Sequence, residues 1–119
     1  MIRWLIWGVF TVSWTTLLLL PGTAYQTTGM DLWPTTVHSL VTKSAHLLAY
    51  ALFAFLSGLL RLPARYRWTV LFFMMAHGAI TETIQQHIGR NGCLEDVDLN
   101  YVGILLGIVV GWKWWTDPR

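Results

Sequence analysis

The stretch ITETIQQHIGRNGCLEDVDLNYVGILLG, from Ile80 to Gly107, carries much of the polarity of an otherwise apolar chain. Two hydrophobic segments flank a short connection that contains Arg90 and three acidic residues. One flanking segment also contains Glu82, and the other contains Asn100. Ionisable side chains within apolar segments are costly unless they pair or do chemical work. This stretch therefore indicates both a class of fold and the place of a site.

The composition of the whole chain indicates a membrane protein with a single domain, residues 1–119. Of the 119 residues, 55% are hydrophobic and 12% are charged, and eight are tryptophans. Soluble domains carry about 25% charged residues. The net charge of +2 is small and no basic cluster is present, so we expect no nucleic-acid partner. The single cysteine, Cys93, excludes an internal disulfide.

Four apolar blocks are each close to the roughly 20 residues that a membrane-spanning helix needs. They are Trp4–Leu20, His46–Leu62, Trp68–Ile84 and Leu99–Trp115. The blocks are too long and too uniformly apolar for barrel strands, which need about ten residues of alternating pattern. The sequence therefore predicts an all-α bundle of four transmembrane helices. A cleaved signal peptide is the alternative for the first block, but that block exceeds the usual apolar core of about 7–15 residues.

The basic residues predict the orientation of the four helices, because cytoplasmic loops are enriched in Lys and Arg. When both termini are placed in the cytoplasm, only Lys43 and Arg90 lie outside. The basic residues inside are then Arg3, Arg61, Arg65, Arg67, Lys113 and Arg119. Among the acids of the connections, Asp117 lies inside, whereas those outside are Asp31, Glu95, Asp96 and Asp98. We therefore expect an N-in, C-in arrangement.

Helical spacing predicts that three polar stripes meet just inside the outer surface, at 100° of rotation per residue. The stripe of the second helix contains Lys43, His46, Tyr50, Ala54 and Ser57. The third helix places Gln85 and Gly78 on the face of Glu82. The stripe of the fourth helix contains Asp96, Asn100, Gly103, Gly107 and Gly111, provided that this helix begins early enough to include Asp96 and Asn100. We expect Glu82 to pair with Lys43 or Arg90, and Asp96 with Arg90, His46 or Asn100. We interpret this convergence as a functional site rather than as pairing that only fixes helix register.

Other residues on the helices have structural interpretations. His77 lies about 140° from Glu82 around the third helix, so we expect it to pack against a neighbouring helix and to matter little for function. The glycines of the fourth helix form consecutive Gly-x-x-x-Gly pairs, which allow close helix contact. Cys93 as a nucleophile would need an activating base, and His87 is the only near candidate in the sequence.

The polar residues also carry a resemblance to a known family. Three motifs follow one another on successive predicted helices: Lys-x-x-His-x-x-x-Tyr in Lys43–Tyr50, Glu-x-x-Gln in Glu82–Gln85, and Asp-x-x-x-Asn-x-x-Gly-x-x-x-Gly in Asp96–Gly107. In this order and spacing the chain resembles the VanZ-like family of small bacterial membrane proteins. The resemblance spans the C-terminal part of the chain from Lys43 onward. It implies a multi-pass protein of the bacterial inner (cytoplasmic) membrane.

The resemblance also implies a ligand-binding set in a pocket towards the outer face: Lys43, His46, Tyr50, Glu82, Gln85, Arg90, Asp96 and Asn100. Gly103 matches the family pattern as well, whereas Cys93 stands where the family commonly has a small hydroxyl residue. The namesake of the family is associated with resistance to the glycopeptide antibiotic teicoplanin. From the family we expect an envelope protein that binds a lipid headgroup or a lipid-linked cell-wall precursor, without assuming resistance for this chain.

Two functional classes remain open at this point. In the first, the pocket only binds, and Lys43, Arg90 and His46 hold a phosphate or carboxylate. In the second, the protein is a membrane-interface hydrolase or transferase acting on a lipid phosphate or acyl group, with His46, Glu82 and Asp96 as the catalytic candidates.

We expect no metal and no other cofactor. His46, Glu82 and Asp96 could form a metal-binding set, but no helix offers the His-x-x-x-His spacing that supports a metal strongly. The expected partners are membrane lipids or a lipid-linked precursor. A second copy of the chain or another membrane protein is left open as a further partner.

Overall fold

The fold is known from a computed structural model, which describes residues 1–20, 29, 32–88 and 94–117, without the side chains of residues 94 and 95. Within these ranges all regular structure is helical. The helices are α1 (Ile2–Leu19), α3 (Thr35–Leu59), α4 (Ala64–His87), α5 (Leu94–Val110) and the short α6 (Trp112–Thr116). The predicted all-α class is therefore confirmed.

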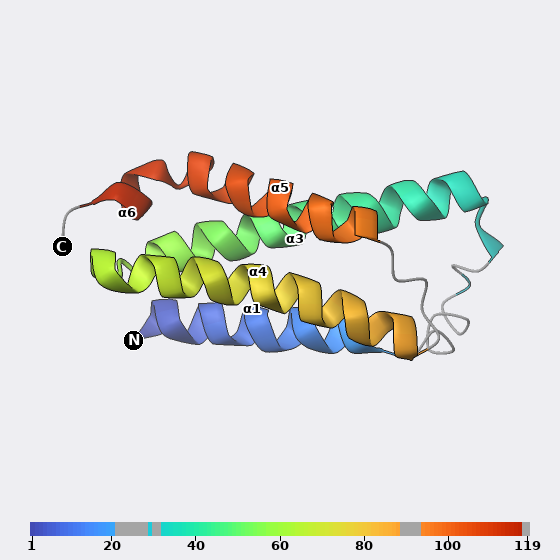
Figure 1. Ribbon diagram of the computed structural model, residues 1–119, viewed down its shortest axis with the longest axis horizontal. Coiled ribbons are helices and arrows are strands. Elements are labelled where there is room, and N and C mark those ends of the chain that lie inside the picture. The colour runs from blue at the N-terminus through green and yellow to red at the C-terminus, as the bar shows by residue number, and fades with distance from the viewer. Residues whose placement is uncertain (21–28, 30–31, 89–93, 118–119) are drawn as a thin grey trace.

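The four long helices run side by side along a body of 49 × 24 × 21 Å (Figure 1). α1 and α5 lie on opposite sides of the bundle, and α3 and α4 each contact both of them. The closest association is between α3 and α5. The start of α1, the start of α4 and the short α6 lie at one end of the bundle, which we call the basic end (Figure 1).

The helix boundaries differ from the predicted ones, most of all at the start of α3 and within the last apolar block. α3 begins at Thr35 rather than at His46, because Pro34 (φ −53°) starts the helix and the polar residues that follow give no apolar signal. The last helix is not continuous to Trp115: it ends at Val110, and Gly111 separates it from α6. α5 begins at Leu94, so Asp96 and Asn100 are helical, as the predicted polar stripe requires.

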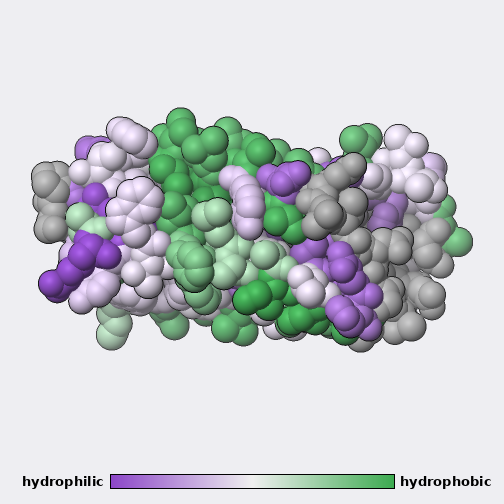
Figure 2. Space-filling view, in the orientation of Figure 1, coloured by the Kyte–Doolittle hydropathy of each residue, from purple (hydrophilic) through white to green (hydrophobic). Residues whose placement is uncertain are grey.

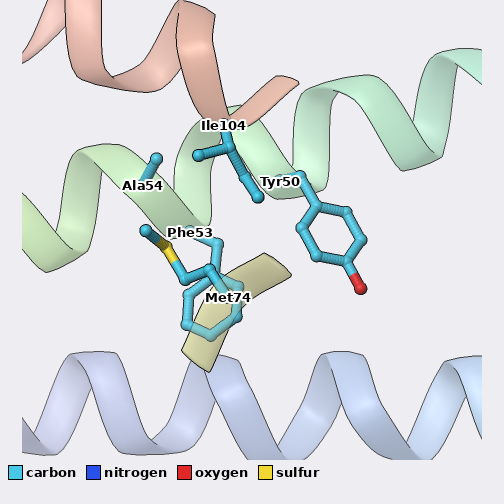
Figure 3. Packing of buried hydrophobic residues seen from close by; sticks show 5 residues of the cluster. All are labelled: Tyr50, Phe53, Ala54, Met74 and Ile104. Carbon is cyan, nitrogen blue, oxygen red and sulfur yellow. The ribbon is translucent and has the colours of Figure 1, made fainter. Parts of the chain in front are cut away.

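The buried apolar cluster lies between α3, α4 and α5, and contains Tyr50, Phe53, Ala54, Met74 and Ile104 (Figure 3). The Tyr50 ring stands at the edge of this cluster, and its hydroxyl points away from the other four side chains (Figure 3). Tyr50 is fully buried. The cluster thus ends at a polar group, and the candidate site lies on that side of it.

Two glycines explain why α5 comes so close to α3. A Cβ atom added to Gly107 would lie 2.7 Å from the Ala54 Cβ and would overlap the backbone carbonyl of Ala51. A Cβ atom added to Gly103 would lie 3.1 Å from the Tyr50 Cβ and would overlap the carbonyl of Leu47. The prediction that these glycines allow close helix contact is confirmed. We call this region the glycine contact.

The basic end is held together by arginines. Arg3 donates to the carbonyl of Leu59 at 3.3 Å, which joins the start of α1 to the end of α3. The Arg67 Nε donates to the carbonyl of Leu62 at 3.1 Å, and another guanidinium nitrogen of Arg67 donates to the carbonyl of Asp117. Basic residues from separate parts of the chain therefore gather at one end of the bundle.

Two helices, Ile2–Leu19 and Thr35–Leu59, are long and apolar enough to cross a membrane by length and composition. Most of α1 is exposed, including Leu5, Val9 and Val12. Apolar residues gather across the middle of the face shown in Figure 2, with hydrophilic residues nearer its ends. These features are compatible with a location in a membrane.

Candidate functional site

Four polar side chains from three helices are buried together at the end of the bundle opposite the basic end. His46 of α3 is 3% exposed, Glu82 of α4 is 2% exposed, and Asp96 and Asn100 of α5 are 7% and 0% exposed. One nitrogen of His46 and one carboxylate oxygen each from Glu82 and Asp96 lie within 4.8 Å of one another. We call these four residues the polar cluster. The structure thus brings the three predicted polar stripes together.

A hydrogen bond within the polar cluster determines which nitrogen of His46 carries a proton. The Nδ1 of His46 lies 2.9 Å from the Oδ1 of Asn100. An amide oxygen only accepts hydrogen bonds, so Nδ1–H is the donor. In the neutral ring, Nε2 then keeps its lone pair and can accept a proton or bind a cation.

Charge is the main energetic problem of the polar cluster. Two ionised carboxylates within 4.8 Å of each other repel by at least about 3 kcal/mol, even at an effective dielectric constant of about 20. Glu82 and Asp96 are buried, so bulk water gives little screening. A positive charge close to both carboxylates would offset this repulsion. The arrangement is therefore suited to holding a proton, a cationic group or a metal ion.

Tyr50 and Asn100 meet at a position where α4 has no side chain. A Cβ atom added to Gly78 would lie 3.2 Å from the Nδ2 of Asn100 and 3.5 Å from the hydroxyl oxygen of Tyr50. The Nδ2 of Asn100 is buried and has no hydrogen-bond partner among the described residues. Gly78 therefore leaves space for two of the predicted site residues at the inner edge of the polar cluster.

Gln85, another predicted ligand-binding residue, is tied to α1. It is 3% exposed, and its Nε2 donates to the carbonyl of Leu18 at 2.8 Å. Leu18 stands in the last turn of α1, where carbonyls lack partners within the helix. Gln85 thus supplies a partner to the end of α1, a structural role that the sequence did not indicate.

His77 is more closely connected to the site than we expected. It does contact neighbouring helices, but through hydrogen bonds: its Nδ1 lies 2.9 Å from the Tyr50 hydroxyl, and its Nε2 lies 2.8 Å from the Thr15 hydroxyl. Thr15 gives its own proton to the carbonyl of Thr11. The Nε2–H of His77 must therefore donate to Thr15, and Nδ1 accepts from Tyr50. The expectation that His77 packs against a neighbouring helix is confirmed, because its ring lies 5.7 Å from that of Phe53 on α3. The hydrogen bond to Tyr50 also links it to the site, which the sequence did not indicate.

Helix α1 contributes residues that the sequence motifs did not include. The Trp14 ring packs edge-on against His46 and Tyr50, with ring centroids 5.8 Å and 6.2 Å apart. Trp14 and Thr15 stand at neighbouring positions in the middle of the first apolar block. Their polar atoms, the indole N–H and the hydroxyl, lie at the centre of an apolar block. This was the signal in the sequence that could have indicated a role of α1 at the site.

Of the two predicted basic ligands, Lys43 lies in the described part of the chain and Arg90 does not. Lys43 is half-buried and lies one turn before His46 on α3, about 4.5 Å away along the helix axis. Arg90 lies outside the described residues, so the predicted pairs of Glu82 and Asp96 with Arg90 stay predictions. Cys93 also lies outside them.

A separate groove of about 460 Å³ lies at the basic end. Its lining consists of Ala64, Arg67, Trp68, Leu71, Ile108, Trp112, Trp115 and Thr116. The described residues that line this groove include no carboxylate and no histidine. Tryptophan and arginine side chains of this kind are typical of the level of lipid headgroups. We therefore place the candidate chemistry at the polar cluster and not at this groove.

Comparison with protein-family models, with curated proteins and with solved structures provides no relative from which a role for these residues could be transferred. None of the three comparisons finds a match to this chain.

Proposed function

We propose that this chain is a VanZ-like protein with four membrane spans, and that its polar cluster binds the headgroup of a lipid or of a lipid-linked cell-wall precursor at the outer face. The observation that carries the proposal is the burial of His46, Glu82, Asp96 and Asn100 in one place by three helices. Ionisable groups at membrane depth mark functional sites by default.

The helix lengths support four spans. α1, α3, α4 and α5 have 18, 25, 24 and 17 residues. At 1.5 Å per residue they are about 26–38 Å long, against a hydrocarbon thickness of about 30 Å. Arg3 and Arg67 gather at the end of the bundle where α1 begins. Since basic residues favour the cytoplasmic side, this end lies inside and the polar cluster lies towards the outer face.

Within this orientation a headgroup would enter between α3, α4 and α5. Lys43, one turn outward from His46, would attract its phosphate, and Arg90 is the other predicted cation of this side. Asn100 can offer its Nδ2–H, which has no partner among the described residues. His46 and the two carboxylates would contact the polar atoms that reach furthest into the bundle.

A second candidate is catalysis on the same headgroup, as a hydrolase or transferase. The hydrogen bond from His46 Nδ1–H to Asn100 favours it, because a general base needs an oriented ring with a free Nε2. Binding remains the first proposal, since it needs only the groups that the polar cluster already brings together.

The two candidates are distinguished by purifying the protein from the membrane and identifying the lipids that remain with it by mass spectrometry. Binding predicts that one lipid class is enriched and returns unchanged after incubation. Catalysis predicts that a product of different mass accumulates. If the lipids only mirror the composition of the membrane, the proposed function is wrong.

The orientation is tested by labelling single cysteines with a membrane-impermeant thiol reagent in a Cys93→Ser background. Thr36 and Ala64 are both exposed, at the starts of α3 and α4. Thr36→Cys should react in intact cells, and Ala64→Cys only after permeabilisation. Labelling of Ala64→Cys in intact cells would place the polar cluster on the cytoplasmic side and exclude an outward-facing pocket.

A further inference from the structure

The geometry points to a divalent metal site within the polar cluster, with His46, Glu82 and Asp96 as ligands and a Zn²⁺-class ion as the occupant. This inference deepens the proposed function and rests on it for the role of the ion, which would bind a phosphate oxygen of the headgroup. It replaces our expectation from the sequence that the site holds no metal.

The first observation is the donor set. One nitrogen and two carboxylate oxygens, each from a different side chain, lie within 4.8 Å of one another, and all three residues are buried. Ligand atoms around one tetrahedral Zn²⁺ are about 3.3 Å apart, given bonds of about 2.0–2.2 Å. The three atoms would need to approach by roughly 1–1.5 Å, which rotations of the two carboxylate side chains can provide.

The second observation is the state of the imidazole. Metal-binding histidines almost always donate their other ring N–H to a carboxylate, carbonyl or water, which fixes the tautomer and the ring orientation. His46 donates Nδ1–H to the Oδ1 of Asn100 at 2.9 Å. The lone pair of Nε2 is thereby available to a metal, and Asn100 acts as a positioning residue.

The third observation concerns the Nδ2 nitrogen of the Asn100 side chain, whose Oδ1 accepts the hydrogen bond from His46. Asn100 is 0% exposed, and its Nδ2 has no hydrogen-bond partner among the described residues. Buried amide N–H groups in proteins are nearly always paired. A metal-bound water or the phosphate oxygen of a headgroup would supply the acceptor. The amide that positions His46 thus also points to a ligand next to it.

Charge gives a fourth reason. A pocket with two carboxylates repels phosphate unless a cation lies between them. A divalent ion neutralises Glu82 and Asp96 and leaves coordination positions open to an oxygen of the headgroup. Zinc sites with three protein ligands keep such an open position. The metal would therefore reconcile an acidic cluster with an anionic ligand.

The type of ion follows from the donors. Imidazole favours Zn²⁺ and its transition-metal neighbours, whereas Mg²⁺ and Ca²⁺ prefer oxygen ligands only. One imidazole with two carboxylates therefore selects a borderline divalent ion over the alkaline-earth ions. Co²⁺ is a suitable probe, because it takes the geometry of Zn²⁺ sites and absorbs visible light.

The test uses the full chain, purified in detergent without added lipid, stripped of metal by a chelator and titrated with Zn²⁺ or Co²⁺. We expect one ion per chain, a Co²⁺ absorption spectrum typical of a four- or five-coordinate site, and displacement of Co²⁺ by Zn²⁺ but not by Mg²⁺ or Ca²⁺. Absence of stoichiometric binding, or equal displacement by Mg²⁺, would overturn the assignment.

Variants locate the ion. His46→Ala, Glu82→Gln and Asp96→Asn should each lower Co²⁺ affinity more than tenfold, and Asn100→Ala should lower it about 10- to 100-fold. Asp98→Asn is the matched control, because Asp98 is an exposed acid of the same helix and should leave the affinity unchanged. If the control and the three ligand variants bound Co²⁺ with equal affinity, the metal would bind elsewhere, and the assignment of His46, Glu82 and Asp96 as ligands would be wrong.

The metal measurement needs no lipid, so it is independent of the proposed function. Should a variant fail to fold, the stoichiometry and the Co²⁺ spectrum of the unaltered protein still decide the question. A chain that binds one ion but enriches no lipid would support the metal site and contradict the headgroup proposal. A chain that binds no ion but still enriches a lipid after chelation would support the headgroup proposal and contradict the metal site.

Discussion

The glycine contact lies on α3 and α5, two of the three helices that build the polar cluster, about one to two turns away from it, yet the two regions are built differently. At the glycine contact, Gly103 and Gly107 bring the α5 backbone against the α3 backbone. This contact depends only on the close fit of the two helices and needs no ligand. In the polar cluster, two carboxylates are buried within 4.8 Å of each other, and a positive charge beside both of them would offset their repulsion. A substitution at the first region should therefore act on folding, and a substitution at the second should act on ligand binding.

The largest effect is expected at the glycine contact. Gly107→Leu would drive a branched side chain into Ala51 and Ala54, so α3 and α5 would have to separate. Overpacking typically costs about 1–3 kcal/mol, and a clash with backbone exceeds that range. We expect a near-complete loss of folded, monodisperse protein, measured by size-exclusion chromatography of a fluorescent fusion.

Gly8→Leu is the matched control, because nothing lies within 4 Å of a Cβ atom at that position of α1. It should preserve the yield of folded protein. A normal yield for Gly107→Leu, or equal losses in both variants, would show that the α3–α5 approach does not stabilise the bundle.

The next effect is expected in the polar cluster, where binding and stability should respond in opposite ways. Glu82→Gln and Asp96→Asn keep the size of the side chain and remove one of two repelling charges. In metal-free, lipid-free protein we expect an unchanged or higher melting temperature, and in both variants a loss of lipid binding. A melting temperature lowered as much as by a core cavity would instead assign these carboxylates to structural pairing.

A double-mutant cycle sharpens this test. If the two carboxylates act on one ligand, Glu82→Gln/Asp96→Asn should bind lipid no worse than the weaker single variant. Residues that share a partner typically show coupling of about 0.5–3 kcal/mol. Additive losses, measured by lipid titration, would mean that Glu82 and Asp96 act independently and that no common ligand lies between them.

Substitution of His77 should give the smallest of these effects, because we expect His77 to stabilise the fold and not to bind the ligand. His77→Ala removes hydrogen bonds to Tyr50 and Thr15 that connect α4 to α3 and α1. Leaving buried partners unpaired costs about 1–3 kcal/mol, so we expect a lower melting temperature with most lipid binding retained.

His87→Ala is the control for His77, since His87 is an exposed histidine of the same helix. The melting temperature of the His87→Ala variant should equal that of the unaltered protein. Loss of lipid binding in His77→Ala at an unchanged melting temperature would place His77 in the binding site and would contradict its structural role.

Sequence patterns predicted much of this arrangement, and the reasons for success and failure are physical. Periodicity along single helices correctly brought His46, Glu82, Asp96 and Asn100 to one place, because a rigid helix fixes which residues share a face. The close helix contact at Gly107 followed from the same regularity, although the sequence did not indicate that α3 is the partner. The early start of α3 at Thr35 was missed, because exposed helical turns need no apolar pattern.

Contacts between helices were harder to predict than faces of helices. His77 lies on a different face from Glu82, yet Tyr50 from another helix reaches it. Trp14 approaches His46 from α1, and the sequence motifs contain no information on that approach. Such contacts depend on the relative rotation of packed helices, which the spacing along one helix does not determine.

Native mass spectrometry most directly tests whether the polar cluster is a ligand site. The unaltered protein and the Glu82→Gln/Asp96→Asn variant would be released from the same membrane under the same conditions, with Asp98→Asn alongside. We predict a chain carrying one lipid of defined mass for the unaltered protein and for Asp98→Asn, and a bare chain for the double variant. Equal lipid occupancy in all three proteins would contradict a headgroup site at Glu82 and Asp96.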